Sequence, residues 1–387
     1  MLESINKIFK DKFKEEPLLV RSPGRVNIIG EHTDYNGGFV LPGAINKAIY
    51  VAVGKRKDAS IHLHAVDFNE SFEVAIADMQ PTKTWATYIL GVANELLQRG
   101  HPVGGFNLVI DGDVPLGAGL SSSAAVECAT VFALNELFSL GLDKMEMVKI
   151  AQKAEHTYAG VMCGIMDQFA SMFGKAGSLI KLDCRSLAFE YIPFKLEGYK
   201  LVLFNTNVKH SLASTQYNLR RQQCEQGVAW VKEQHQEVNS LRDVTIEMLD
   251  QLVKPKDLII YKKCRFVVEE IQRLSDACVA LENEDIQTLG KKMFETHDGL
   301  SKDYEVSCKE LDYLVDAVRE KPGVLGARMM GGGFGGCTIN IIQEDAIEAI
   351  ESAITKAYKR DMQLELTTHI VVLGEGTALQ YLNMQKV

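Results

Sequence analysis

The chain has 387 residues, of which 46% are hydrophobic and 24% charged, the balance of an ordinary globular protein. This length exceeds what one hydrophobic core usually serves, so the sequence predicts two domains that share a cleft. A net charge of -9 argues against a nucleic-acid partner, because such a partner requires concentrated Lys and Arg side chains.

Cysteine usage and hydropathy narrow the class of protein further. The eight cysteines are spread along the chain without a C-x-x-C pair, which indicates neither a zinc site nor a disulfide scaffold. Residues 1–13 lack the apolar core of a signal peptide, and no apolar run approaches the roughly 18 residues of a membrane helix. We therefore expect a cytoplasmic protein with buried thiols and no membrane partner.

The predicted elements mix helices and strands along the chain. Four short strands come first, at 48–53, 61–65, 72–76 and 106–110. Apolar residues at helical spacing then predict helices within 121–158, followed by strands at 178–182, 189–192 and 201–204. Residues 214–320 read as almost continuous helices, with a break at Lys254-Pro255-Lys256. The chain closes on strands at 324–329 and 338–342, a helix at 346–358 and a strand at 367–373.

This mixture predicts an α+β protein and not a regular βαβ array. No Pro-rich or Ser-rich linker marks a boundary between domains. We place the boundary within 185–200, which gives domains 1–190 and 191–387.

The first motif, residues 21–38, gathers Arg25, Glu31, His32 and Asp34 between glycines. A short strand at 26–29 followed by a polar turn would project these side chains into one pocket. Carboxylates and imidazole can bond the vicinal hydroxyls of a sugar. The alternative is a solvated hairpin turn, and the absence of H-E-x-x-H spacing argues against zinc.

The second motif, residues 113–125, is a glycine loop with three serines that leads from a strand into a helix. Free N–H groups and the helix dipole make such a helix start an anion site. The serine hydroxyls add donors to phosphate or a ligand to Mg²⁺. The loop is not a Walker A sequence. The alternative is that Ser121 or Ser122 only caps the helix.

The third motif, residues 331–337, contains G-x-G-x-x-G but leads into a predicted strand, and a dinucleotide fingerprint opens a helix. A nicotinamide-dependent oxidoreductase is therefore a remote alternative. The open readings are a tight turn without ligand, or a close approach of the backbone to a ligand or to the second motif.

The three motifs, in this order, resemble the signature motifs of the GHMP kinase superfamily, and residues 30–38 resemble the galactokinase signature within it. Similar segments follow at 155–156, 163–168, 207–213 with Tyr217, and 297–300. The resemblance implies a two-domain fold, with an N-terminal ribosomal-S5-like domain and a C-terminal ferredoxin-like domain. It implies transfer of the γ-phosphate of ATP to the C1 hydroxyl of galactose, with the active site in the cleft.

The resemblance also assigns roles to residues. It implies that Asp167 is the catalytic aspartate and Arg25 its partner, a base–electrostatic pair. The implied sugar-binding residues are Glu31, His32, Thr33, Asp34, Gly164 and Tyr217. The implied loop for the ATP phosphates comprises Gly117, Ala118, Gly119, Leu120, Ser121, Ser122 and Ser123. Ser123 and Glu155 match the Mg²⁺ positions.

Other readings remain open from the sequence. Without the resemblance, Glu155 would be read as a surface salt bridge and Asp167 as a helix cap. The substrate could be N-acetylgalactosamine or another hexose, and the protein could be a non-catalytic sensor of galactose and ATP. We expect small-molecule partners only, and a monomer or weak oligomer.

Overall fold

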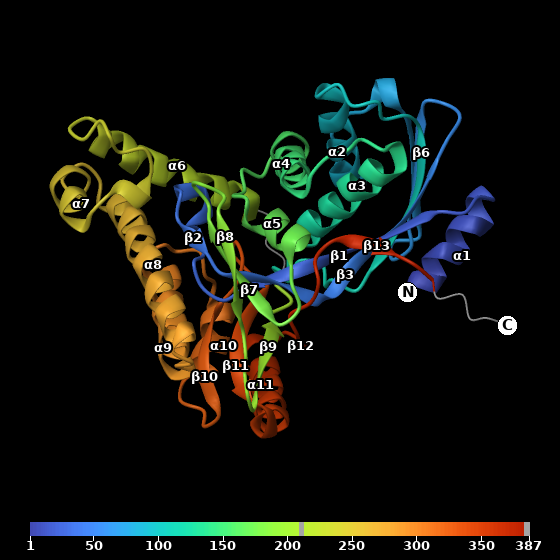
Figure 1. Cartoon of the computed structure of the whole chain (residues 1–387). Helices are drawn as coiled ribbons and strands as arrows, with labels where there is room; N and C mark the ends of the chain where they lie inside the picture. The colour runs from blue at the N-terminus through green and yellow to red at the C-terminus, as the bar shows by residue number, and fades with distance from the viewer. Residues whose placement is uncertain (209–212, 383–387) are drawn as a thin grey trace.

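The computed structural model describes residues 1–208 and 213–382. Of the similar segment 207–213, Lys209, His210, Ser211 and Leu212 lie outside the described residues. Helices and strands are mixed along the chain, which confirms the predicted α+β class (Figure 1).

A six-stranded sheet forms the centre of the first half, in the order β13-β1-β3-β6-β4-β5. Its strands are β13 (Ala378–Gln380), β1 (Leu18–Asn27), β3 (Pro42–Lys55), β6 (Phe106–Gly112), β4 (Ser60–Ala65) and β5 (Glu70–Ala75). Neighbouring strands are antiparallel except β4 and β6, which are parallel.

Helices cover both faces of this sheet (Figure 1). Helices α3 and α5 lie on one face with α2 and α4 packed against α3, and α1 covers the other face. These helices are α1 (Leu2–Phe13), α2 (Ala86–Gln98), α3 (Ser122–Phe138), α4 (Lys144–Ala154) and α5 (Met166–Phe173). Because both faces are covered, β1 and β3 carry apolar residues at successive positions, as in Leu19-Val20 and Val51-Ala52.

Two smaller sheets complete the strands. The three-stranded sheet β2-β7-β8 contains β2 (Phe39–Val40), β7 (Ser178–Asp183) and β8 (Phe189–Pro193). The four-stranded sheet β10-β11-β9-β12 contains β10 (Val324–Met329), β11 (Cys337–Gln343), β9 (Tyr199–Asn205) and β12 (Thr367–Val371).

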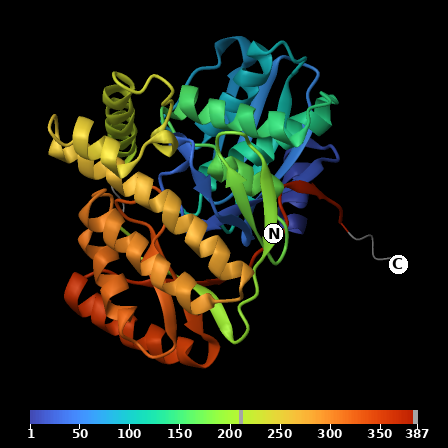
Figure 2. The same ribbon diagram turned by 60° about the vertical axis from the view of Figure 1, so that its left-hand side comes forward.

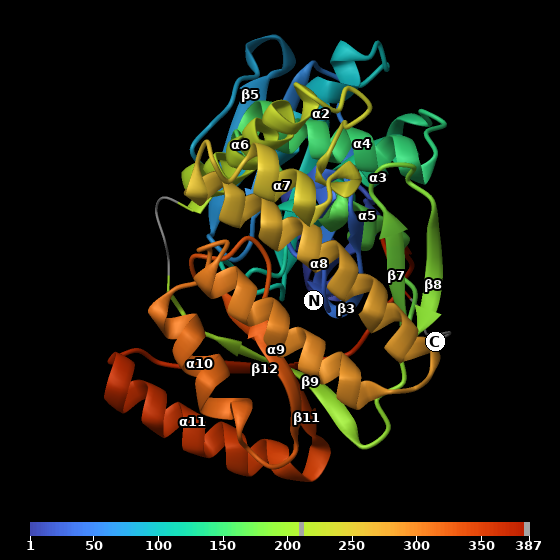
Figure 3. The ribbon, with the colours of Figure 1, turned by 90° about the vertical axis from the view of Figure 1, so that its left-hand side faces the viewer.

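Helices α10 (Lys309–Arg319) and α11 (Ile347–Met362) pack on the four-stranded sheet, and α9 (Ile286–Lys302) packs on β10 (Figure 3). The remaining helices are α6 (Ala213–Lys232), α7 (Ile246–Leu252) and α8 (Leu258–Glu282). Helix α8 runs along both halves of the molecule (Figure 2), because its Leu274 belongs to the main core and its Phe266 to a second cluster with Tyr304.

Every strand and helix region predicted from 48 to 373 is present, with bounds that shift by a few residues. The predicted strand at 26–29 is wrong in its extent, because β1 spans Leu18–Asn27 and passes through Pro23-Gly24 at a register shift. The sequence did not predict helices α1, α2 and α5 or strands β2 and β13.

Strand β13 lies far along the chain from β1, yet the two strands pair in the first sheet. The domain boundary near 190 stays a prediction. Among the described residues, no helix has the length and apolar character needed to cross a lipid bilayer.

Candidate active site

The second and third motifs meet through their backbones. A Cβ atom added to Gly331 would lie 3.1 Å from the carbonyl oxygen of Gly119, and one added to Gly336 would lie 3.1 Å from the carbonyl carbon of Ala118. Gly331 and Gly336 also have positive φ, which favours glycine. The sequence left open whether the third motif is only a tight turn or approaches a ligand or the second motif closely. The structure shows the close approach to the second motif.

The first motif enters the same place through β1. The amide of Arg25 donates to the carbonyl of Leu120 at 3.1 Å. Gly24 permits this approach, because a Cβ there would lie 2.7 Å from the same carbonyl oxygen. Ala118 and Leu120 are buried, so the rest of this loop is held against the core through their side chains. Gly117 has a positive φ and nothing within 4 Å of an added Cβ.

Arg25 and Asp167 form a two-contact ion pair at this junction. Nε of Arg25 donates to Oδ1 of Asp167 at 2.8 Å, and Nη2 donates to Oδ2 at 3.0 Å. The Arg25 side chain is 3% exposed and that of Asp167 is 27% exposed. Burial opposes the charge of Arg25, but Asp167 and Glu31 nevertheless raise its pKa. The carboxylate of Asp167 is thus held by a permanent cation while remaining open to a ligand.

Ser121 makes a third side-chain hydrogen bond to the Asp167 carboxylate. Its hydroxyl donates to Oδ2 at 2.5 Å, and its backbone is left-handed with φ 58°. Ser121 occupies the position before α3 but makes no side-chain bond to the helix amides. Asp167 lies in the first turn of α5, and the cap position is Ile165. Neither residue is the simple helix cap of the alternative readings.

A small pocket opens beside Asp167. Five of the six predicted sugar-binding residues line it, together with both catalytic candidates. These lining residues are Glu31, His32, Asp34, Gly164, Tyr217, Arg25 and Asp167. Residues from the first half, from α6 and from the third motif therefore meet around one cavity.

Thr33 does not line this pocket. Its hydroxyl bonds the carbonyl of Gly30 at 2.9 Å and that of Phe39 at 2.5 Å, and the residue is fully buried. The structure gives Thr33 a role in closing the turn of the first motif.

Glu31 is fixed by a residue that sequence reasoning missed. Its Oε1 accepts from Nη2 of Arg328 at 3.0 Å and from the amide of Gly331 at 2.9 Å. Arg328 is fully buried and also donates to the carbonyls of Asn27 and Ile28. A lone Arg in a predicted strand carries no sequence signal for such a role, because strand charges usually face solvent.

Gly164 makes room for Asp34. A Cβ on Gly164 would lie 1.8 Å from Oδ2 of Asp34, so no larger residue fits there without displacing the carboxylate. Burial and the neighbouring Asp167 raise the pKa of Asp34 to about 7. The three carboxyl groups that line this pocket, those of Glu31, Asp34 and Asp167, match the hydrogen-bonding needs of a polyhydroxylated ligand.

His32 is neutral at physiological pH. Burial lowers its pKa to about 4, although the Glu31 carboxylate acts in the opposite direction. Its backbone has φ 62°, in the left-handed region, and its ring packs against that of Tyr217 with centroids 5.2 Å apart. The side chain can therefore offer one donor and one acceptor without charge.

Ser123 and Glu155 face each other behind the glycine loop. The Ser123 hydroxyl donates to Oε1 of Glu155 at 2.9 Å, and Oε2 accepts from Gln168 Nε2 at 2.7 Å. Glu155 begins a π-helical turn and is 7% exposed, which rules out a surface salt bridge. The same Gln168 amide donates to Glu127, another residue that the sequence did not single out, at 3.1 Å.

The side-chain oxygen atoms of Ser123 and Glu155 suit a divalent cation that takes few ligands from the protein. Mg²⁺ prefers hard oxygens, and it usually takes one or two carboxylates together with water and phosphate oxygens. Within residues 1–208 and 213–382, no group of three or more His, Cys, Asp or Glu side chains could hold a metal by itself. A Ser–Glu pair beside a phosphate loop is consistent with that preference.

A second cavity, of about 260 Å³, is lined in part by Ser122 and Ser123. Its walls combine apolar and aromatic side chains with two carboxylates, and the residues are Leu116, Trp85, Tyr88, Phe68, Asp67 and Asp111. Such a pocket suits a planar heterocycle whose phosphates reach the glycine loop. Trp85 and Tyr88 were missed because they belong to no motif.

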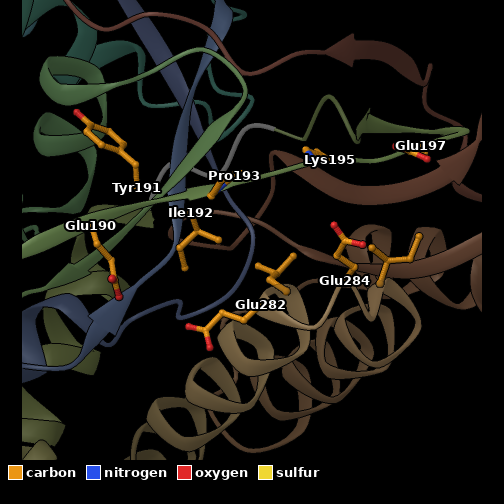
Figure 4. A pocket seen from close by; sticks show the side chains of 10 residues that line it. Glu190, Tyr191, Ile192, Pro193, Lys195, Glu197, Glu282 and Glu284 are labelled. Carbon is orange, nitrogen blue, oxygen red and sulfur yellow. The ribbon is translucent and has the colours of Figure 1, made fainter.

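A larger cavity, of about 500 Å³, lies elsewhere, between β8 and the turn from α8 to α9 (Figure 4). It is lined by the glutamates Glu190, Glu197, Glu282 and Glu284 with Lys195 and Tyr191. It contains no residue of the three motifs and does not belong to the candidate site.

Family profiles match three parts of the chain. They are described as galactokinase galactose-binding signature (residues 7–55), GHMP kinases N terminal domain (residues 87–175) and GHMP kinases C terminal (residues 277–360). The first profile contains the first motif, and the second contains the glycine loop and Asp167.

Whole-chain similarity is also extensive. The chain is 42% identical to a galactokinase of Thermotoga petrophila over 92% of this chain and 98% of that protein. It is 39% identical to a galactokinase of Fusobacterium nucleatum over 97% of this chain and 99% of that protein. The crystal structure of Lactococcus lactis galactokinase complexed with galactose matches with a TM-score of 0.94 and 32% identity, covering 98% of this chain and 100% of that chain. Methanococcus jannaschii mevalonate kinase, at 17% identity and a TM-score of 0.64 over 94% and 100% of the two chains, shares the fold.

Proposed function

The chain belongs to the galactokinase family of GHMP kinases, and on this basis we propose that it transfers the γ-phosphoryl group of ATP to the C1 hydroxyl of α-D-galactose. The observation that carries the proposal is the contact of Arg25 and Ser121 with Asp167. It holds the Asp167 carboxylate between the glycine loop and the pocket beside Asp167, which we call the sugar-side pocket.

The sugar binds in the pocket lined by Glu31, His32 and Asp34, with its C1 hydroxyl toward Asp167. Glu31, His32 and Asp34 bond the ring hydroxyls, and Tyr217 covers the pocket from α6. A site built to bond a hydroxyl can reject an analogue that cannot make the bond by up to about 10⁴–10⁵. The C4 hydroxyl, which separates galactose from glucose, is read by Asp34 with Glu31 and Tyr217.

Phosphoryl transfer depends on positioning and charge stabilisation more than on covalent chemistry. Asp167 accepts the proton of the C1 hydroxyl, a contribution of about 10²–10⁴ in rate. Arg25 cannot lose its proton at neutral pH, so it holds the carboxylate in place and stabilises negative charge that develops at the reacting oxygens.

ATP binds with its base in the cavity of Trp85 and Tyr88 and its phosphates against residues 117–123. We propose that Ser123 and Glu155 hold a Mg²⁺ ion there. When bound, this ion neutralises phosphate charge. The two side chains already face each other at 2.9 Å.

The test is a coupled ADP-release assay on the purified full chain with Mg²⁺-ATP and a panel of sugars. The panel holds galactose, glucose, N-acetylgalactosamine and arabinose, and NMR identifies the phosphorylated carbon. Fast turnover on galactose to the 1-phosphate supports the proposal.

Other outcomes would contradict parts of it. A preference for N-acetylgalactosamine or another hexose would support kinase activity but show that the sugar specificity assigned to residues 31–34 is wrong. Galactose binding without turnover on any sugar would indicate a sensor. Sedimentation velocity would test the expected monomer or weak oligomer.

A further inference from the structure

A chain of buried hydrogen bonds leads from the sugar-side pocket into the second half of the molecule. Nδ1 of His32 lies 2.7 Å from the hydroxyl of Tyr35, which lies 2.8 Å from the hydroxyl of Tyr304. The Tyr304 hydroxyl is in turn 3.3 Å from Sγ of Cys224. His32, Tyr304 and Cys224 are all buried.

Ring packing fixes the same side chains. The ring centroid of Tyr304 lies 4.9 Å from that of His32 and 4.9 Å from that of Phe266 on α8. Tyr35 packs edge-on against His32 and Tyr217. The imidazole therefore has one orientation available, and that orientation is set largely by a residue between α9 and α10.

The other nitrogen of His32 is unsatisfied. Nε2 is buried and has no hydrogen-bond partner of good distance and angle among the described residues, although a looser hydrogen bond between the ring and the Gly332 backbone acts to raise the pKa of His32. His32 and Gly332 both line the sugar-side pocket. A buried ring nitrogen without a partner carries a free-energy cost that a ligand hydroxyl would relieve.

The hydrogen bond at Nδ1 determines whether Nε2 carries the ring hydrogen. A separation of 2.7 Å is the usual length for an O–H donor and the short limit for an N–H donor, which favours Tyr35 as the donor to Nδ1. Tyr304 then donates to Tyr35, and the Cys224 thiol completes the chain. A neutral imidazole carries one ring hydrogen, which in this arrangement is on Nε2.

We propose that Tyr304, acting through Tyr35, is a positioning residue that holds His32 in the Nε2–H tautomer, so that Nε2 donates to a hydroxyl of the bound sugar. This inference rests on the proposed function, because it takes the pocket as the sugar site. It makes sugar recognition by the first motif depend on a residue from the second half of the chain.

The first test is ¹⁵N NMR of the histidine ring nitrogens in the full chain, with the His32 signals assigned by loss in His32→Gln. Wild-type protein is expected to show a protonated Nε2 on His32. The Tyr304→Phe variant, which keeps the ring, is expected to show a mixture of tautomers. A protonated Nδ1 in the wild type would overturn the proposal, and this readout requires no turnover.

The second test uses deoxy and deoxyfluoro galactose at each ring hydroxyl, since fluorine can accept a hydrogen bond and cannot donate one. At the position that His32 contacts, the deoxy sugar should bind about tenfold more weakly than galactose, while the fluoro sugar keeps most of the affinity. Equal losses for the two analogues at every position would overturn the donor assignment.

Kinetics of Tyr304→Phe separate positioning from general damage. The KM for galactose is expected to rise about 3–10-fold with kcat within about twofold, because His32 does not touch the reacting oxygen. Tyr313→Phe is the matched control, since its hydroxyl also makes one bond, to Asp361 at 2.7 Å, far from the pocket. If the KM of Tyr304→Phe equalled that of Tyr313→Phe while the wild type phosphorylated galactose, the positioning role of Tyr304 would be wrong and the proposed function would remain. If the wild type did not phosphorylate galactose, the proposed function itself would be refuted.

Discussion

The hydroxyl of Ser121 donates a 2.5 Å hydrogen bond to Oδ2 of Asp167, the same oxygen that Nη2 of Arg25 contacts. A loop expected to hold phosphate and a carboxylate expected to accept a proton are thus in direct contact. Arg25 also donates to the carbonyl of Gly119 in that loop. Any displacement of the glycine loop is therefore transmitted to the carboxylate.

Replacing Asp167 by Asn should lower kcat by about 10²–10⁴ while leaving galactose binding measurable. The amide cannot accept the C1 proton but keeps the size of the side chain. Steady-state ADP release and calorimetric galactose binding would be measured together, with the exposed Asp361→Asn as control. Near-wild-type kcat would refute the role of Asp167.

Gly164→Ala should raise the KM for galactose at least tenfold, equivalent to about 1.4 kcal/mol. The added methyl would occupy the space of the Asp34 carboxylate, with Cβ 1.8 Å from Oδ2. Gly104→Ala is the control, because its Cβ would make ordinary contact with Phe138 at 3.4 Å. An unchanged KM in Gly164→Ala would show that Asp34 is not needed in its present position.

Arg328→Met should reduce the free energy of unfolding by about 3–5 kcal/mol, since it leaves the buried Glu31 carboxylate without its cation. Urea denaturation would measure the loss. Arg360→Met, at an exposed pair with Asp361, should leave the urea midpoint unchanged. A loss below about 1 kcal/mol would mean that the interior tolerates an unpaired Glu31.

Asp34→Asn should stabilise the sugar-free protein, and more at pH 8 than at pH 5. The folded-state pKa of Asp34 is raised from 3.8 to about 7 by burial and by Asp167. The folded protein therefore loses stability as the pH rises from about 4 to 7, and Asn removes this loss. Thermal unfolding at the two pH values would measure it, with exposed Asp78→Asn as control. An equal Tm difference at both pH values would contradict the shift.

Glu155→Gln and Glu127→Gln should separate two neighbouring carboxyl groups. Burial raises the pKa of Glu127 well above its ordinary value, so a neutral isostere should leave the Mg²⁺ requirement nearly unchanged. Glu155→Gln removes a proposed ligand and should raise that requirement about tenfold or more, by analogy with the cost of losing one charged contact. Magnesium titrations of ADP release, and Mn²⁺ binding followed by electron paramagnetic resonance, would compare them. Equal effects of the two substitutions would count against Glu155 as the ligand.

Much of the site could be predicted because its residues stand in compact motifs. Arg25, Glu31, His32 and Asp34 are neighbours in sequence, and the local turn brings them to one pocket. The exception, Thr33, shows the limit of a motif: its neighbours face the pocket while its own hydroxyl bonds the backbone of Gly30.

The remaining site residues depend on tertiary contacts. Arg328 is fully buried although it is charged, because four oxygen atoms from the ends of β1 and β10 and from the loop after β1 surround it. Trp85, just before α2, and Tyr88, in its first turn, reach the second cavity, and neither residue stands in a motif that would have marked it in the sequence. Strand β1 was underestimated because Pro23-Gly24 normally ends a strand, whereas here a register shift absorbs them.

The pairing of β13 with β1 affects how the chain would respond to cleavage. Gln380 pairs with Leu19, and the hydroxyl of Thr377 bonds that of Ser22 at 2.8 Å, in the middle of the strand that carries Arg25. After a single proteolytic cut between β8 and β9, both fragments would therefore still contribute strands to one sheet, with β13 of the second fragment paired to β1 of the first. Separately expressed halves cut at that point should complement each other, and trimming the second half before residue 377 should abolish the complementation.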